Sequence, residues 1–104
     1  MQHSITHGLD HALARKATRK AIESYQQRFG EYRPTASWVG EDHADISFTV
    51  AGKTLKGAID VRASKIDLDL DVPMVFYPFR NMAMKVIEEE IQVWIQKAKG
   101  GQIA

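Results

Sequence analysis

The sequence predicts an α+β domain: an antiparallel β-meander of four to five strands, with an N-terminal helix and a long C-terminal helix packed on one face. Residues 46–72 alternate apolar and polar side chains, which is the period of half-buried strands. Residues 9–29 and 76–98 instead repeat apolar side chains every three or four positions, the period of one helical face. The 104 residues match a single domain over residues 1–104, with no linker, internal repeat or low-complexity segment.

The N-terminal part is expected to hold a short strand and then a helix. Residues 3–7 place Ile5 between polar neighbours, which fits an edge strand. A helix over residues 9–29 would end near Gly30, a residue type common after helices. Its inner stripe is poorer in large side chains than the C-terminal one and consists of Leu9, Leu13, Ala17, Ala21, Ile22, Tyr25 and Phe29.

The meander is predicted to begin after a proline break, with a strand over residues 35–39. Residues 46–50 alternate in the same way and should form the next strand. Because glycine is the first residue of Gly52-Lys53, we expect a type II′ turn there. That turn would set Phe48 opposite Gly57 on the following strand.

A second two-residue turn is expected at Ala63-Ser64, after the strand formed by residues 55–62. It would set Asp60 opposite Asp67, which repel, while Arg62 and Asp67 attract on the diagonal. The charged side chains of these strands would therefore share a solvated outer face, and the apolar ones would face the helices.

The C-terminal helix carries the richest apolar stripe and should contribute most to the core. Prolines are tolerated before a helix or in its first turn, so Pro73 and Pro78 place the start between Tyr77 and Arg80. Gly100-Gly101 should end it. The stripe consists of Phe76, Phe79, Ala83, Val86, Ile87, Ile91, Trp94, Ile95 and Ala98.

Composition excludes several classes of protein. The formal net charge of +1 gives no general attraction to nucleic acids or acidic membranes. Without cysteine there is no disulfide, no thiolate nucleophile and no cysteine metal site. No apolar stretch approaches the ~20 residues that span a bilayer, and the N-terminus does not resemble a secretory signal. We therefore expect a cytoplasmic protein.

The first candidate site is an excess of apolar residues around the start of the C-terminal helix. Methionine and aromatic side chains adapt to irregular partners. They could line a ligand cavity, contact a hydrophobic partner or form the face of a homodimer, and core plus dimer is slightly favoured. The residues concerned are Met74, Phe76, Tyr77, Phe79, Met82 and Met84.

The second candidate is a basic patch on the N-terminal helix. Arg15, Lys16, Arg19 and Lys20 form two pairs spaced by four residues, with only Glu23 nearby to offset them. Such a patch could bind phosphates or another anionic surface. Because no aromatic residues interleave and no recognition motif is present, a solvated helix face is the favoured interpretation and nucleic acid is not the expected partner.

Metal binding and catalysis find little support. His3, His7 and His11 are spaced by four residues, but Gly8 and the strand-like Ile5 argue against one continuous helix through all three. The alternating aspartates of the last strand lack the glycine-centred loop of a calcium site. Nucleophile-elbow, phosphate-loop and zinc-protease motifs are absent. The sequence therefore predicts a non-enzymatic protein with no catalytic residue, no metal site and no cofactor.

Four segments carry a resemblance to a known family. They are residues 7–12 at the start of a helix, 38–41 at the start of the sheet, 50–61 around the glycine-bearing hairpin, and Pro78-Phe79 before the last helix. With these segments in this order, the chain resembles the polyhydroxyalkanoic acid system family of small bacterial proteins, also described as a polyhydroxyalkanoate granule region. It departs from the usual pattern at residues 71–77, where the family often has a glycine-leucine turn.

The resemblance implies an association with polyhydroxyalkanoate storage and brings no catalytic residues. The leading hypothesis is a non-enzymatic accessory protein that binds a granule or a protein partner through an apolar surface, most simply as a homodimer. The alternative is a module that binds a small acyl or lipid-like ligand between sheet and last helix, which needs a cavity of about 300 Å³ or more. A third hypothesis is an anion or nucleic-acid binder using the basic patch.

Overall fold

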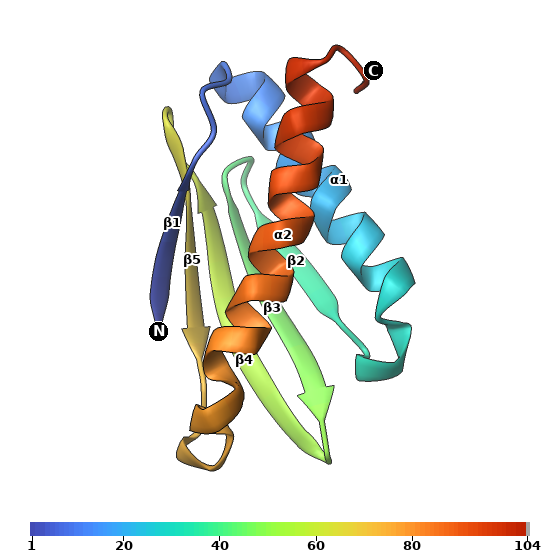
Figure 1. Cartoon of the computed structure of the whole chain (residues 1–104), viewed down its shortest axis with the longest axis vertical. Helices are drawn as coiled ribbons and strands as arrows, with labels where there is room; N and C mark the ends of the chain where they lie inside the picture. The colour runs from blue at the N-terminus through green and yellow to red at the C-terminus, as the bar shows by residue number, and fades with distance from the viewer. Residues whose placement is uncertain (104) are drawn as a thin grey trace.

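The computed structural model describes residues 1–103, without the side chains of residues 75, 76, 79 and 80. Five strands form one sheet, and both long helices cover the same face of it (Figure 1). In chain order the elements are β1 (Gln2–Thr6), α1 (His11–Arg28), the 3₁₀ turn η1 (Gly30–Tyr32), β2 (Thr35–Val39), β3 (His43–Val50), β4 (Lys53–Val61), β5 (Lys65–Asp71), the 3₁₀ turn η2 (Met74–Phe79) and α2 (Arg80–Lys99). The predicted α+β class is confirmed.

The sheet is antiparallel throughout, with strand order β1-β5-β4-β3-β2. The N-terminal strand β1 is therefore an edge strand, as predicted, and pairs with β5 so that Ile5 lies opposite Ile66. The remaining strands follow one another as a meander that ends at the other edge with β2. This order leaves β1 and β2 as the two edges of the sheet.

The predicted turn between β3 and β4 was displaced by one residue. The turn residues are Ala51 and Gly52, with φ of 51° and 76°. Two successive positive φ angles are those of a type I′ turn, whose twist matches that of the flanking strands. Phe48 consequently lies opposite Leu55, and it is Ile46 that lies opposite Gly57. The pairing thus slides by two residues, which keeps every predicted side chain on its predicted face.

The β4–β5 pairing agrees with the prediction. Asp60 lies opposite Asp67, and Arg62 Nε donates to Asp67 Oδ2 at 3.1 Å across the diagonal. Arg62 N also donates to Lys65 O at 2.7 Å, which closes the turn. The outer face of the sheet therefore carries interleaved charges of both signs.

Helix α1 begins two residues later than predicted because Asp10 caps it. Leu13 N donates to Asp10 Oδ1 at 2.8 Å, and the extended backbone of Asp10 lies outside the helix. The buried face of α1 is made of small side chains, namely Ala14, Ala17, Thr18 and Ala21. Such a face allows α1 to approach α2 closely, which explains why its stripe is poor in large residues.

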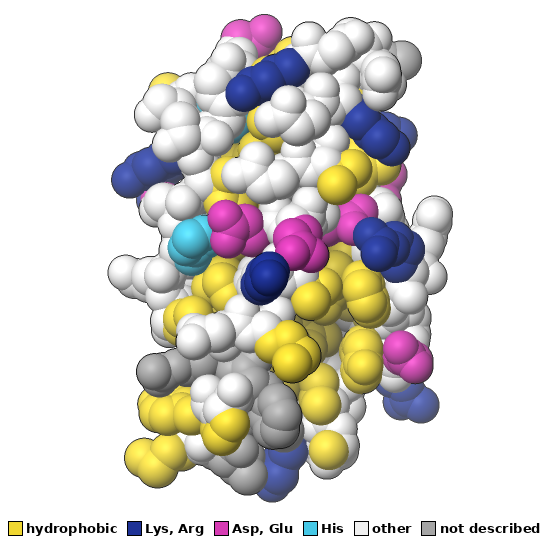
Figure 2. Space-filling model, in the orientation of Figure 1, with side chains coloured by type: hydrophobic (Ala, Val, Ile, Leu, Met, Phe, Trp, Pro, Cys, Tyr) yellow, Lys and Arg dark blue, Asp and Glu magenta, His cyan; other side chains and the backbone are white. Residues whose placement is uncertain are grey.

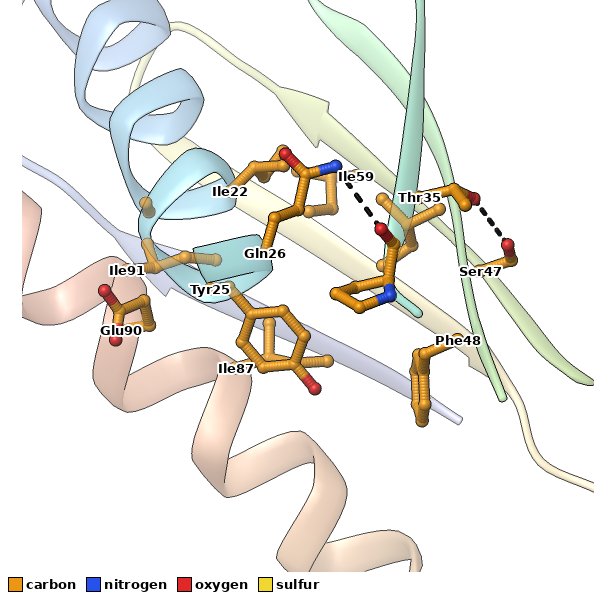
Figure 3. Close-up of a pocket in the computed structure, with 13 residues that line it drawn as sticks. Ile22, Tyr25, Gln26, Thr35, Ser47, Phe48, Ile59, Ile87, Glu90 and Ile91 are labelled. Carbon is orange, nitrogen blue, oxygen red and sulfur yellow. Dashed lines mark hydrogen bonds between the residues drawn. The ribbon is translucent and has the colours of Figure 1, made fainter. Parts of the chain in front are cut away.

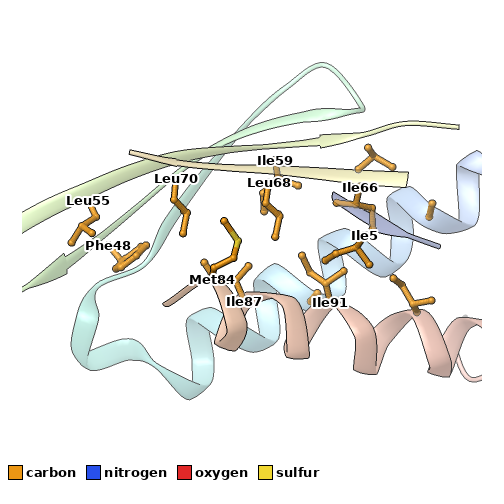
Figure 4. Close-up of a cluster of buried hydrophobic side chains, with 14 of the residues drawn as sticks. Ile5, Phe48, Leu55, Ile59, Ile66, Leu68, Leu70, Met84, Ile87 and Ile91 are labelled. Atoms are coloured by element: carbon orange, nitrogen blue, oxygen red, sulfur yellow. The ribbon is translucent and has the colours of Figure 1, made fainter. Parts of the chain in front are cut away.

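Helix α2 begins at Arg80 and ends before Gly100, as the prolines and glycines predicted. Gln102 N donates to Lys97 O at 2.8 Å, and Gly101 has the positive φ of 72° that this type of helix end requires. Along α2 the core side chains lie against those of the sheet (Figure 4). The labelled side chains that meet there are Ile5, Phe48, Leu55, Ile59, Ile66, Leu68, Leu70, Met84, Ile87 and Ile91.

Candidate functional site

An exposed apolar surface lies where η2 passes into α2. Met74 is 80% exposed, Met82 65% and Tyr77 45%, although all three are large apolar or aromatic side chains. Apolar side chains gather at this end of the molecule, around the part left grey in Figure 2. We call Met74, Tyr77 and Met82 the apolar end surface.

The structure separates the six residues that the sequence grouped here. Met84 does not belong to the surface: it is only 3% exposed and packs against the sheet, because it lies on the same side of α2 as Ile87 and Ile91. The side chains of Phe76 and Phe79 lie outside those that the structure describes. The apolar end surface is therefore defined by the remaining three.

A hollow of about 560 Å³ borders this surface, between η2 and the β1–β5 edge of the sheet. Tyr77 and Asn81 line one side of it. The facing wall is Met1 together with the end of β5, where Asp69 and Asp71 contribute carboxylates. The apolar end surface thus has an acidic rim on the sheet side.

A smaller apolar cavity lies between α1, α2 and the β2–β3 side of the sheet (Figure 3). Its volume is about 40 Å³, room for a few water molecules and far below the roughly 300 Å³ of a small-molecule site. Ile22, Tyr25, Phe48 and Ile87 enclose it. Burial raises the pKa of the Tyr25 hydroxyl, which keeps that group neutral.

Glu90 is a buried carboxylate at the edge of this cavity. Arg28 from the end of α1 forms an ion pair with it, and Trp94 Nε1 donates to Glu90 Oε1 at 3.2 Å. Glu90 is the third residue of the acidic run 88–90 and is not among the site residues predicted from the sequence. The available signal was its position three residues after Ile87 and four before Trp94, on the flank of α2 that faces α1.

The basic patch on α1 is largely engaged within the fold. Arg15 donates to both carboxylate oxygens of Asp42, at 2.6 and 3.3 Å, and this contact holds the pKa of Asp42 below its usual value. The guanidinium of Arg19 lies 4.1 Å from the centre of the Trp38 ring. Lys20 lies 3.9 Å from Glu23.

Lys16 is exposed on the same helix. The four residues therefore do not act together as a free cationic surface. Two of them instead attach α1 to the β2 strand and the loop after it.

The histidines have separate structural partners. His7 is fully buried, with Nε2 2.9 Å from Arg62 O and Nδ1 accepting from Leu9 N. His11 Nε2 lies 3.0 Å from Asp42 Oδ1, while His3 Nε2 lies 2.8 Å from Glu88 Oε2. Within the described part of the chain, no three His, Asp or Glu side chains are grouped so that they could hold a metal ion.

His43 is held between two carboxylates on the outer face of the sheet. Its Nδ1 lies 2.7 Å from Asp60 Oδ1 on β4, and its Nε2 lies 2.9 Å from Asp45 Oδ1 on β3. Asp60 first, and then Asp45, raise the pKa of His43 because both favour the charged imidazolium. This arrangement couples the charge of the imidazole to the pairing of β3 with β4.

The comparison with known families assigns the chain. The family model described as "putative polyhydroxyalkanoic acid system protein" matches residues 2–95, which is nearly the whole chain and runs from β1 to the last turns of α2. The protein belongs to this family. No curated protein matches the chain significantly. Among the helices of the described residues, none is long and apolar enough to cross a membrane.

Proposed function

We propose that this family member is a non-enzymatic accessory protein of polyhydroxyalkanoate storage, acting in the cytoplasm and binding the granule through the apolar end surface. Membership of the family supports the link to polyhydroxyalkanoate. The exposure of Met74 and Met82 is the observation that supports the mode of binding. A granule-bound protein with an apolar patch is the alternative partner for the same surface.

The chemistry of the surface suits a partner without a fixed shape. Methionine side chains are flexible and polarisable, so they can adjust to an irregular apolar surface such as an amorphous polyester. Burial of one such side chain contributes about 1.5–3 kcal/mol when complete. Two exposed methionines within eight positions of each other therefore offer enough energy for reversible attachment.

The two other hypotheses have less support from the geometry. An acyl ligand would need several times the 40 Å³ of the apolar cavity beside Glu90. The larger hollow of about 560 Å³ has the volume, but the carboxylates of Asp69 and Asp71 line it and suit an acyl chain poorly. An anion binder would have to release Arg15 from Asp42 and Arg19 from Trp38 before either could bind phosphate. We therefore place the functional surface at the start of α2.

Co-sedimentation with isolated granules tests the proposal. The double variant Met74→Glu/Met82→Glu should reduce the fraction of protein bound at least about tenfold, because two apolar contacts are replaced by charges. Val93→Glu is the matched control, since Val93 is also an exposed apolar residue of α2 but lies eleven positions beyond Met82. Equal sedimentation of all three proteins, or an unchanged polymer content after gene deletion, would contradict the proposal.

A further inference from the structure

The most accessible sulfur atoms of this chain belong to the apolar end surface. The chain has four methionines and no cysteine, so thioethers are its only sulfur groups. Met74 and Met82 are the two most exposed large apolar side chains among the described residues. Met84 follows Met82 by two positions on the same helix and is buried against the sheet. The methionines of α2 therefore differ sharply in their access to dissolved reagents.

We propose that Met74 and Met82 are a pair of oxidation sites for hydroperoxides, and that their conversion to sulfoxides releases the protein from the granule polyester. The release step rests on the proposed function. In each oxidation the thioether sulfur binds the hydroxyl oxygen of the peroxide and the O–O bond breaks. The proton of that hydroxyl passes to the departing oxygen, which leaves as an alcohol or water. The sulfur loses two electrons and the peroxide gains them.

The oxidation can be reversed chemically. Methionine sulfoxide reductases return the sulfoxide to the thioether. A dithiol supplies the two electrons and becomes a disulfide, while the sulfoxide oxygen leaves as water. The apolar end surface can therefore alternate between an apolar and a polar state without any change in the chain itself.

Oxidation turns the end of each side chain into a hydrogen-bond acceptor. A sulfoxide has no N–H or O–H group, and the repeating unit of a polyester also contains only acceptor oxygens. Attachment would remove water from the sulfoxide without replacing its hydrogen bonds, which is unfavourable. The ionised carboxylates of Asp69 and Asp71 beside the surface supply no donor either. The side chains that favour attachment when reduced therefore oppose it when oxidised.

Oxidation of the exposed pair should leave the fold intact. Met74 in η2 and Met82 in α2 face water, so their sulfoxide oxygens would stay hydrated. Met84 instead lies in the core with Ile87 and Ile91 (Figure 4), where a sulfoxide would lack hydrogen-bond partners. Its burial also protects Met84 from reagents in solution for as long as the protein stays folded. Peroxide should therefore change the surface before it disturbs the core.

Peptide mapping during a time course with hydrogen peroxide tests the oxidation sites. Met74 and Met82 should be oxidised at least about tenfold faster than Met84 in the folded protein. The difference should disappear when the protein is unfolded in urea, because all thioethers are then accessible. Equal rates for Met82 and Met84 in the folded protein would overturn the assignment.

Sedimentation with protein-free polyhydroxyalkanoate particles tests the release step. Peroxide treatment of the wild type should raise the dissociation constant at least about tenfold, and a methionine sulfoxide reductase with a dithiol should restore it. Met74→Leu/Met82→Leu is the matched control, because leucine keeps the apolar volume without the sulfur. It should bind within about twofold of the reduced wild type before and after peroxide. Met1, which is 41% exposed, can still be oxidised in this variant.

The outcomes separate release from attachment. Undiminished binding of the oxidised wild type, or an equal loss in the leucine variant, would overturn the release step and leave the proposed function in place. Reduced protein that binds granules but not protein-free particles would also overturn it, because the polyester would not be the partner. Reduced protein that binds neither would contradict the proposed function and the release step together.

Discussion

Replacing Gly57 with alanine should destabilise the protein, although the change adds only one methyl group. Gly57 lies in the middle of β4, between Ile46 on β3 and Leu70 on β5. A Cβ atom there would lie 2.6 Å from the backbone oxygen of Asp69 and 2.7 Å from Leu70 Cδ2. Both distances are below the 3.0 Å that real Cβ contacts respect. The Leu70 side chain can rotate, but the backbone oxygen can move only with its strand.

The expected magnitude follows from two opposed effects. Overpacking of a filled interior costs about 1–3 kcal/mol. Alanine also lowers the entropy of the unfolded chain, which returns about 0.4–1 kcal/mol. The net loss should be about 1–2 kcal/mol in the free energy of unfolding. For a domain of this size the midpoint of thermal unfolding should fall by roughly 5–15 °C.

Urea unfolding followed by tryptophan fluorescence measures this change. Gly30→Ala is the matched control, because a Cβ atom at Gly30 would meet no heavy atom within 4 Å and its backbone does not have a positive φ. That variant should remain within about 0.5 kcal/mol of the wild type. If Gly57→Ala were as stable as Gly30→Ala, the inference that β4 and β5 lie too close at Gly57 for a Cβ atom would be refuted.

Two further predictions concern charged side chains. Because Asp60 and Asp45 raise the pKa of His43, the charged imidazole should stabilise the fold fully below about pH 6.5. This contribution should decline as the pH rises through the folded-state pKa. His43→Gln should therefore remove the decline from a plot of unfolding free energy against pH, and an unchanged plot would contradict the contact. Arg28→Met should lower the free energy of unfolding in urea by about 1–3 kcal/mol, because it leaves the buried Glu90 carboxylate without its cationic partner. The double variant Arg28→Met/Glu90→Gln should recover much of that loss, because it removes the buried charge as well. A loss that does not recover would show that the ion pair is not the cause.

The basic residues of α1 show how tertiary contacts change the meaning of a sequence pattern. In the sequence, Arg15 and Arg19 form a cationic patch with a possible anionic partner. In the structure Arg15 bonds to Asp42, which lies twenty-seven positions away, and Arg19 lies over Trp38. A helical spacing identifies which residues share a face, but it contains no information on which distant strand or loop that face meets.

The run of three glutamates in α2 shows a similar limit. Glu88, Glu89 and Glu90 have the same local propensity, and only the rotation of α2 against α1 decides that Glu90 is buried. Met84 was misplaced for a different reason. Its spacing of three and seven positions from Ile87 and Ile91 sets it on the buried side of α2, but in the sequence it also lies beside a surplus of apolar residues.

The sequence by itself determined the class of the fold, the strand and helix periods, the inward and outward faces, the start of α2 within the predicted interval and the pairing of Asp60 with Asp67. These features depend on residues close together in the chain, whose spacing and turn chemistry act locally. The tertiary structure decided the turn at Ala51-Gly52. A turn at Gly52-Lys53 would keep the same side chains on each face of the sheet and differ only in which residues of β3 and β4 lie opposite each other. It also decided the burial of Glu90, since that burial depends on the close packing of α2 against α1, which is distant in sequence.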